Sequence, residues 1–213
     1  MFVTENRMAT GEYDKTKARL VADGSQQDAS LYPDKSSPTL AMHSLYTVLA
    51  MYAGMSGYLM AKADIKGAFV QTPMEGPDVY MRIRRKVVAY LLVMYPEYVE
   101  FVQADGSIVT LLLKAMYGCV QASKLWYKLL IKVLTSAGYV VSETDPCVLR
   151  RVVDSMIFII LIYADDLLIF VTKKELAALR ALLTEAFKTI KMEIGASLLS
   201  LVPSGDARPV RFT

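Results

Sequence analysis

The sequence predicts an α+β fold in which helices cover one face of an antiparallel sheet. Apolar runs with strand character alternate with segments of helical spacing, and the second half of the chain implies two tight hairpins. Of the 213 residues, 54% are hydrophobic, which is enough to bury one substantial core with a smaller lobe attached. Strands that alternate with helices and end in a hairpin suit a split β-α-β arrangement.

The N-terminal part is polar from residue 4 to residue 37 and predicts an irregular lobe with one short strand at 18–22. Turn-forming residues gather at 24–28 and 33–38. A helix is predicted over 40–53, because this segment follows Ser and Pro residues that suit a helix start.

The middle of the chain predicts strands and then a helix. Residues 57–63 lead into Asp64, and residues 79–83 alternate with β-branched and aromatic side chains, so both segments are expected to be strands. A further strand is predicted at 108–113, and apolar residues at helical spacing predict a helix over 123–136.

The C-terminal part predicts a strand meander and a final helix. The apolar segments 147–152, 156–163 and 167–171 are separated by very short polar loops, which implies two hairpins. Residues 173–191 place their leucines on one helical face and are predicted to form one amphipathic helix.

Charge and cysteine content narrow the function only a little. A formal net charge of +3 and a pI near 8.7 permit a nucleic-acid partner without requiring one. Cys119 and Cys147 lack the spacing of a zinc site or a disulfide framework, so we expect reduced core residues. No signal peptide or lipidation motif is visible, and we therefore expect an intracellular location.

A membrane protein is one alternative that the sequence raises. Residues 40–60 contain no Asp, Glu, Lys or Arg and are long enough to span a bilayer, but their hydroxyls, glycines and His43 favour a buried helix. Residues 156–171 would be a second span, in which Asp165 and Asp166 would each cost about 3 kcal/mol. We expect no membrane association.

Two adjacent carboxylates, Asp165 and Asp166, interrupt the apolar stretch 159–170. An uncompensated buried carboxylate costs several kcal/mol, so these acids either lie at an exposed turn or bind a cation. The local pattern by itself favours the exposed turn. Asp64 ends another apolar segment, either as a surface strand residue or as a third carboxylate beside the hairpin. Three converging carboxylates would offer the hard oxygen ligands that one or two Mg²⁺ ions require.

Five short segments occur in an order that is similar to one known family. They are residues 17–22 (KARLVA), 63–69 (ADIKGAF), 114–127 (KAMYG followed by QASKLWY), 145–148 (DPCV) and 163–166 (YADD). Each segment is weak alone, but in this order they resemble the reverse transcriptases of copia-type LTR retrotransposon polyproteins. The resemblance covers roughly residues 12–195.

The resemblance implies a fingers and palm fold with a thumb that is missing or incomplete. It divides the chain into residues 1–38, a partly irregular portion of the fingers, residues 39–195, the palm with the remaining fingers elements, and residues 196–213, a tail or the truncated start of a thumb. The thumb and RNase H regions would belong to other parts of a polyprotein.

The activity implied by the resemblance is RNA-directed DNA polymerisation. The substrates would be a primer-template nucleic acid and deoxynucleoside triphosphates, and the cofactors two Mg²⁺ ions, for which Mn²⁺ is a substitute. The resemblance also implies a cytoplasmic location, within virus-like particles. The alternative within the same fold is a catalytically inactive remnant that binds nucleic acid, which salt-dependent binding without nucleotide incorporation would indicate.

The resemblance also assigns the acids. Asp64, Asp165 and Asp166 match the catalytic residues that bind the metal ions, with Asp64 and Asp165 as the principal ligands. Tyr163 matches a position on the primer side. Ala164 stands where the family usually has valine.

Five further residues match positions that contact the incoming nucleotide. Ala68 and Phe69 correspond to positions near its sugar, where Phe69 is the candidate steric gate against a 2′-hydroxyl. Gln121 corresponds to a residue near the sugar and phosphates. Lys17 and Arg19 resemble cations of the fingers that meet the triphosphate; without the resemblance, a solvated strand face would be preferred for them.

Overall fold

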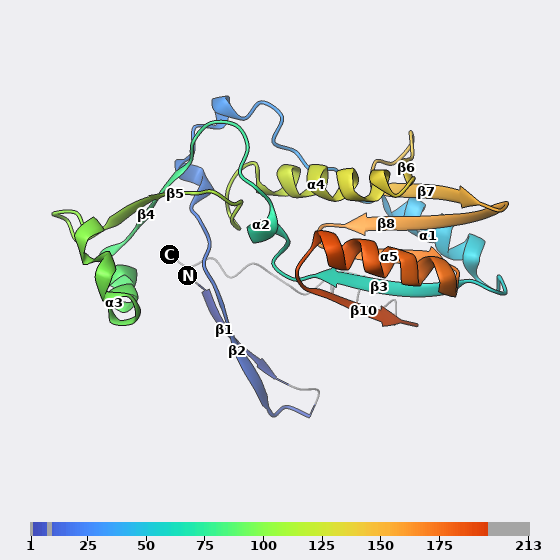
Figure 1. Cartoon of the computed structure of the whole chain (residues 1–213), viewed down its shortest axis with the longest axis horizontal. Helices are drawn as coiled ribbons and strands as arrows, with labels where there is room; N and C mark the ends of the chain where they lie inside the picture. The colour runs from blue at the N-terminus through green and yellow to red at the C-terminus, as the bar shows by residue number, and fades with distance from the viewer. Residues whose placement is uncertain (1, 8–9, 196–213) are drawn as a thin grey trace. The chain divides into compact units, whose positions relative to one another are not determined.

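The computed structural model describes residues 2–7 and 10–195, and the chain divides into two compact units (Figure 1). The first, here called the lobe unit, comprises the chain up to Pro38 and Gly67–Ser136. The second, here called the sheet unit, comprises Thr39–Lys66 and the described residues from Ala137 onward. Each unit is therefore assembled from two separate stretches of sequence. The tail expected at 196–213 lies outside the described residues.

Within its described residues, the sheet unit contains a six-stranded antiparallel sheet, here called the large sheet, with the order β10-β3-β9-β8-β7-β6 (Figure 1). Its strands are β3 (Leu59–Ile65), β6 (Val140–Val141), β7 (Val148–Val153), β8 (Met156–Tyr163), β9 (Asp166–Val171) and β10 (Ile190–Ile194). Both predicted hairpins are confirmed, because β7 pairs with β8 and β8 pairs with β9. The predicted strand that leads into Asp64 is confirmed as β3, which ends one residue after Asp64.

Helix α1 (Met42–Tyr52) covers one face of the large sheet, where its Leu45 and Val48 are buried. They form a core cluster with side chains of β8 and β9, namely Ile159, Leu161, Leu168 and Phe170. The helix predicted over 40–53 is thereby confirmed.

Helix α5 (Lys173–Ala186) lies on the opposite face. Its Glu175 binds Arg151 of β7, and Arg151 is the register partner of Phe158 on β8. Neighbouring residues of a strand point to opposite faces, so Phe158 and Ile159 lie on different faces of the sheet. Arg151 therefore lies on the face away from Ile159, and Figure 1 shows α5 in front of the sheet and α1 behind it. The prediction of helices on one face is wrong here. Because β8 and β9 are apolar at consecutive positions, both faces of the large sheet must be covered.

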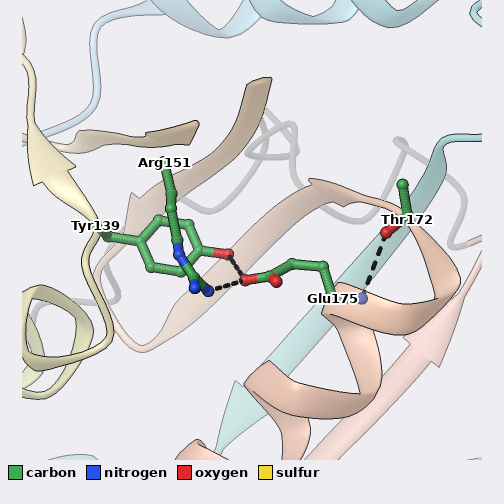
Figure 2. A network of polar contacts seen from close by, with 4 residues as sticks. All are labelled: Tyr139, Arg151, Thr172 and Glu175. Carbon is green, nitrogen blue, oxygen red and sulfur yellow. Dashed lines mark hydrogen bonds and ion pairs between the residues drawn. The ribbon is translucent and has the colours of Figure 1, made fainter. Parts of the chain in front are cut away.

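A buried polar network ties α5 to the sheet, as Figure 2 shows. The Glu175 carboxylate accepts a hydrogen bond from the Tyr139 hydroxyl at 3.0 Å and one from the Arg151 guanidinium at 2.6 Å. Glu175 is 9% exposed, and burial is the main cause that raises the pKa of Tyr139, followed by the charge of Glu175. Thr172 begins the helix, since its hydroxyl accepts a hydrogen bond from the Glu175 N–H.

Asp145 supplies the N-terminal cap that α1 lacks locally. Ala41 makes no capping bond with its own side chain, but its N–H donates to Oδ2 of Asp145 at 3.1 Å. The other oxygen of Asp145 accepts from the Cys147 N–H at 2.9 Å. Asp145 is only 4% exposed, so this carboxylate fixes the start of α1 against the loop before β7.

Where the structure describes it, the lobe unit contains two small antiparallel ribbons and several helices. Strand β1 (Phe2–Arg7) pairs with β2 (Tyr13–Arg19), and β4 (Tyr80–Ile83) pairs with β5 (Ile108–Leu111). The helical segments are η1 (Gly24–Gln26), η2 (Ala29–Leu31), α2 (Ala68–Gln71), α3 (Arg85–Met94), η3 (Pro96–Phe101) and α4 (Ala122–Ser136). The predicted strands at 79–83 and 108–113 and the helix over 123–136 are confirmed.

Two of the expected elements differ in the structure. The ribbon of β1 and β2 occupies only the first part of the segment expected to be irregular, and β2 ends at Arg19 where a strand was expected at 18–22. A ribbon held by backbone hydrogen bonds needs no apolar pattern, so the sequence did not reveal it. The helix predicted over 173–191 ends at Ala186, since Phe187 is extended at φ −128° and ψ 130°. The chain then forms β10, an edge strand that pairs with β3.

The cysteine prediction is confirmed, since Cys119 and Cys147 are free and buried. Among the described residues, none of the helices has both the length and the apolar character needed to cross a bilayer. The stretch 40–60 forms α1 and the beginning of β3 instead.

Candidate active site

The tip of the β8–β9 hairpin holds the adjacent acids. Tyr163 pairs with Asp166, which leaves Ala164 and Asp165 as a two-residue loop. Ala164 has a positive φ of 54°, the kind of backbone geometry that lets a two-residue loop follow the twist of its strands. The tight turn therefore places Asp165 in the loop and Asp166 at the first position of β9.

Strand β3 brings Asp64 to this tip. In the β3–β9 register Asp64 is the direct partner of Asp166, and the Ile65 N–H donates to the Asp165 carbonyl oxygen at 3.3 Å. Directly opposed residues of an antiparallel pair point to the same face of a sheet. The backbone therefore brings Asp64 and Asp166 together, although they are about a hundred residues apart in sequence.

A lysine offsets part of this negative charge. Lys62 lies two residues before Asp64 on β3, and its Nζ is 3.3 Å from Oδ1 of Asp166. The side chains of Lys62 and Asp166 are only 18% and 27% exposed. Burial raises the pKa of Asp166, while Lys62 lowers it and the charges of Asp165 and Asp64 raise it further. The carboxylate thus has a cationic partner in a partly desolvated place.

The acidic side chains at the hairpin tip do not form a preformed metal-binding site among the described residues. Among the residues that the structure describes, no three His, Cys, Asp or Glu side chains are grouped so that they could hold a metal ion. The arrangement offers instead two opposed carboxylates, a third acid in the adjoining loop, and Lys62 bound to one of them. Oxygen ligands of this kind suit a hard divalent cation, so the chemistry of the donor set fits magnesium.

The residues expected near the nucleotide sugar belong to the lobe unit. Gly67, in the left-handed region at φ 66°, begins the short helix α2, where Ala68 is fully buried and Phe69 is half-buried. The Phe69 ring meets the Tyr117 ring edge-on, with centroids 4.6 Å apart. Tyr117 was not among the predicted site residues, although it lies within one of the family-like segments.

Gln121 is held firmly inside the lobe unit. Its side chain is 4% exposed, accepts a hydrogen bond from Nε2 of Gln27 at 3.2 Å and donates to the sulfur of Met74 at 3.2 Å. The oxygen of Gln27 accepts in turn from the Val120 N–H at 2.8 Å. The family-like segment 114–127 thus meets the loop around Gln27 through a pair of glutamines.

The remaining predicted residues lie on strands. Lys17 and Arg19 belong to β2, opposite Thr4 and Phe2, but their side chains lie outside what the structure describes. Tyr163 is 37% exposed at the end of β8. Lys62 is the residue that sequence reasoning missed, although its position two residues before Asp64 in a strand places it on the same face.

Comparison with known proteins identifies the family. The family model described as "Reverse transcriptase (RNA-dependent DNA polymerase)" matches residues 2–200. The chain is 31% identical over 164 residues to the "Retrovirus-related Pol polyprotein from transposon TNT 1-94" of Nicotiana tabacum, which covers 76% of this chain and 11% of that protein. It is 32% identical over 169 residues to the "Retrovirus-related Pol polyprotein from transposon RE1" of Arabidopsis thaliana, covering 78% of this chain and 10% of that protein.

The chain thus spans about a tenth of the length of the curated relatives it matches. No solved structure gives a significant match. The family match extends over all of the described residues and includes both the Asp64 strand and the Asp165–Asp166 hairpin. The chain belongs to the reverse transcriptase family, as a part related to the Pol polyproteins of retrotransposons.

Proposed function

We propose that this chain is an RNA-directed DNA polymerase segment of a retrotransposon Pol polyprotein, which adds deoxynucleotides to the 3′-hydroxyl of a primer. The observation that carries the proposal is the β3–β9 register, in which Asp64 faces Asp166 beside the loop that holds Asp165. In a family whose members copy nucleic acid, acids at such a hairpin tip are the natural candidates for catalysis.

In this proposal Asp64, Asp165 and Asp166 hold two magnesium ions, and Mn²⁺ can replace them. Bound there, the ions would activate the primer hydroxyl and stabilise the leaving pyrophosphate. The contribution of the chain is to hold the carboxylates on the rigid backbone of β3 and β9. The direct pairing of these strands limits the relative movement of Asp64 and Asp166.

The other roles follow the same proposal. The ring of Phe69 occupies the space that a 2′-hydroxyl would need, beside Ala68, and Gln121 borders the sugar and phosphates. Lys17 and Arg19 meet the triphosphate, as cations suited to phosphate oxygens do. Tyr163 supports the primer terminus, consistent with its partly exposed position beside Asp166.

The sheet unit would be the palm, because it carries the three acids, and the lobe unit would supply fingers elements. Primer-template nucleic acid and other regions of a Pol polyprotein would be the partners, since the curated relatives extend far beyond the matched part. We propose the cytoplasm as the location.

A second candidate is a nucleic-acid-binding remnant without catalysis. The observation that favours it is the Lys62–Asp166 ion pair, which occupies one of the proposed ligands, together with the lack of a three-residue metal group among the described residues. Such a protein would bind nucleic acid with an affinity that falls as salt rises, because cations of the protein replace counterions at the phosphates. It would incorporate no nucleotide.

Extension of a primed homopolymer by the purified chain in Mg²⁺ separates the two candidates. The proposal expects Mg²⁺-dependent extension that is abolished by Asp165→Asn. A matched control is Asp154→Asn, which changes the exposed acid in the other hairpin loop, between β7 and β8. Asn tolerates the positive φ of 49° at that position, so this control should fold and extend normally. Extension that survives Asp165→Asn would refute the assignment.

A further inference from the structure

Charged side chains alternate across three strands at the end of the large sheet. Asp64 of β3 is the register partner of Lys191 on β10 and of Asp166 on β9, and Lys62 of β3 is the partner of Glu193 on β10. Register partners and residues two apart in a strand share a face, so these five side chains lie on one face. Each acid therefore has a lysine among its neighbours.

Lys62 occupies the central place in this pattern. Asp64 and Asp166 are like charges set directly opposite each other, which destabilises a sheet unless another charge offsets them. Lys62 lies beside both and binds Asp166 at 3.3 Å, where the pair is largely shielded from solvent. A partly buried ion pair of this kind is screened less by salt than a surface pair.

A second acid lies on the other side of Lys62. Glu193 is directly opposite Lys62 in the β10–β3 register and binds Lys191 at 2.5 Å. The pKa of Glu193 is lowered mainly by Lys191, and Lys62 adds to the effect. Lys62 thus has an acid on each neighbouring strand: Asp166 on β9, which it binds, and Glu193 on β10, with which it interacts electrostatically.

We propose that Lys62 is a built-in counter-ion of the acid pair, which neutralises Asp166 until a divalent cation binds and then moves toward Glu193. This inference rests on the proposed function, because it takes Asp64 and Asp166 to be metal ligands. Lys62 is then a positioning residue that sets the cation concentration at which the acids become available.

Competition between the Lys62 ammonium and a divalent cation for Asp166 has a measurable consequence. A ligand that must first displace an internal partner binds more weakly than it would to the free site. Removing the charge of Lys62 should therefore tighten the binding of a divalent cation, whereas a merely structural lysine would leave this affinity unchanged or weaken it.

The test is a titration of the purified chain with Mn²⁺, followed by electron paramagnetic resonance of the free ion, without nucleic acid or nucleotide. Lys62→Met keeps the length and apolar stem of the side chain and removes its charge. We expect Mn²⁺ to bind this variant about three- to tenfold more tightly than the native chain. Lys62→Arg retains the charge and should bind Mn²⁺ as the native chain does.

The matched control is Lys174→Met, which removes an exposed lysine from the first turn of α5, on the other face of the large sheet. Its affinity should stay within about twofold of native, since exposed charges are well screened. Should Lys62→Met misfold, Lys62→Gln gives a second uncharged variant with the same expectation.

Equal or weaker Mn²⁺ binding by folded Lys62→Met or Lys62→Gln would overturn the inference, as would an equal gain in Lys174→Met. Failure of the proposed function is recognised separately, by primer extension that does not respond to Asp165→Asn. If primer extension depends on Asp165 but the Mn²⁺ affinity does not change when Lys62 is replaced, the proposed function is upheld and only the counter-ion role of Lys62 is refuted.

Discussion

Asp64 and Asp166 are direct register partners on neighbouring antiparallel strands, one at the end of β3 and the other at the start of β9. Two carboxylates in this relation repel each other, and burial adds to the cost by raising the pKa of Asp166. A fold can retain such a pair when a cation offsets it, whether this is Lys62 or a bound metal. This relationship underlies both the proposed chemistry and the proposed counter-ion.

Sugar selection should depend on Phe69. Phe69→Ala removes a ring that contacts Tyr117 and opens space beside Ala68, so we expect incorporation of ribonucleotides relative to deoxynucleotides to rise at least about tenfold. Single-nucleotide incorporation assays with matched dNTP and rNTP pairs measure this ratio. Phe101→Ala removes an exposed ring from η3 and serves as the control. An unchanged ratio in Phe69→Ala would exclude Phe69 as the steric gate.

The sheet unit should lose stability when Arg151 is removed. Arg151→Met removes one of the two side-chain partners of the buried Glu175 carboxylate and leaves only the Tyr139 hydroxyl (Figure 2). Because Arg151 is itself about one-third exposed, we expect a loss of about 2 kcal/mol in the free energy of unfolding, measured by urea denaturation. The neighbouring Arg150→Met, at an exposed position on the other face, should change it by less than about 0.5 kcal/mol. Equal losses in the two variants would contradict this role.

Asp145 should make stability depend on acid pH. Burial alone would raise the pKa of Asp145, but hydrogen bonds from Ser44 and from the Cys147 and Ala41 N–H groups outweigh it and lower the pKa below 3.8. The ionised carboxylate therefore stabilises the folded state above pH 3.8, and this contribution is lost as pH falls through the lowered pKa.

Asp145→Asn tests this dependence. We expect the variant to be less stable than the native chain by about 1 kcal/mol at pH 7, since a neutral amide caps α1 less well. The difference should shrink as pH falls below 3.8 toward the lowered pKa, because the folded-state carboxylate becomes protonated only there. Urea unfolding of both proteins across this range measures it. A difference that stays constant with pH would show that the charge of Asp145 does not stabilise the fold.

The meander of β7, β8 and β9 could be predicted from sequence because long apolar runs are separated by two-residue loops. The helices that cover the two faces of this meander could not be predicted as readily. Consecutive buried residues such as Ile159 and Ile160 show that both faces are apolar, but periodicity alone does not say which helix covers which face. Strand β10 was missed because its isoleucines continue the apolar pattern of α5, and only the short segment 187–189, which begins with an extended backbone at Phe187, separates the two elements.

The candidate site was predictable in its residues but not in its contacts. The order of family-like segments selected Asp64, Asp165 and Asp166, and the register that joins Asp64 to Asp166 required the paired strands to be seen. Lys62 could not be predicted as part of the site, because a lysine in a strand is ordinarily a solvated surface residue. Its partner on β9 lies about a hundred residues away, and no local pattern indicates that distant contact.

The central claim is that Asp64 and Asp166 together hold a divalent cation, and Mn²⁺ binding by their asparagine variants tests it most directly. We expect Asp64→Asn and Asp166→Asn each to weaken Mn²⁺ binding at least about tenfold relative to the native chain, because each removes a charged oxygen ligand. Asp154→Asn, in the loop at the other end of β8, should bind as the native chain does. Native affinity in the Asp64→Asn variant would contradict the account.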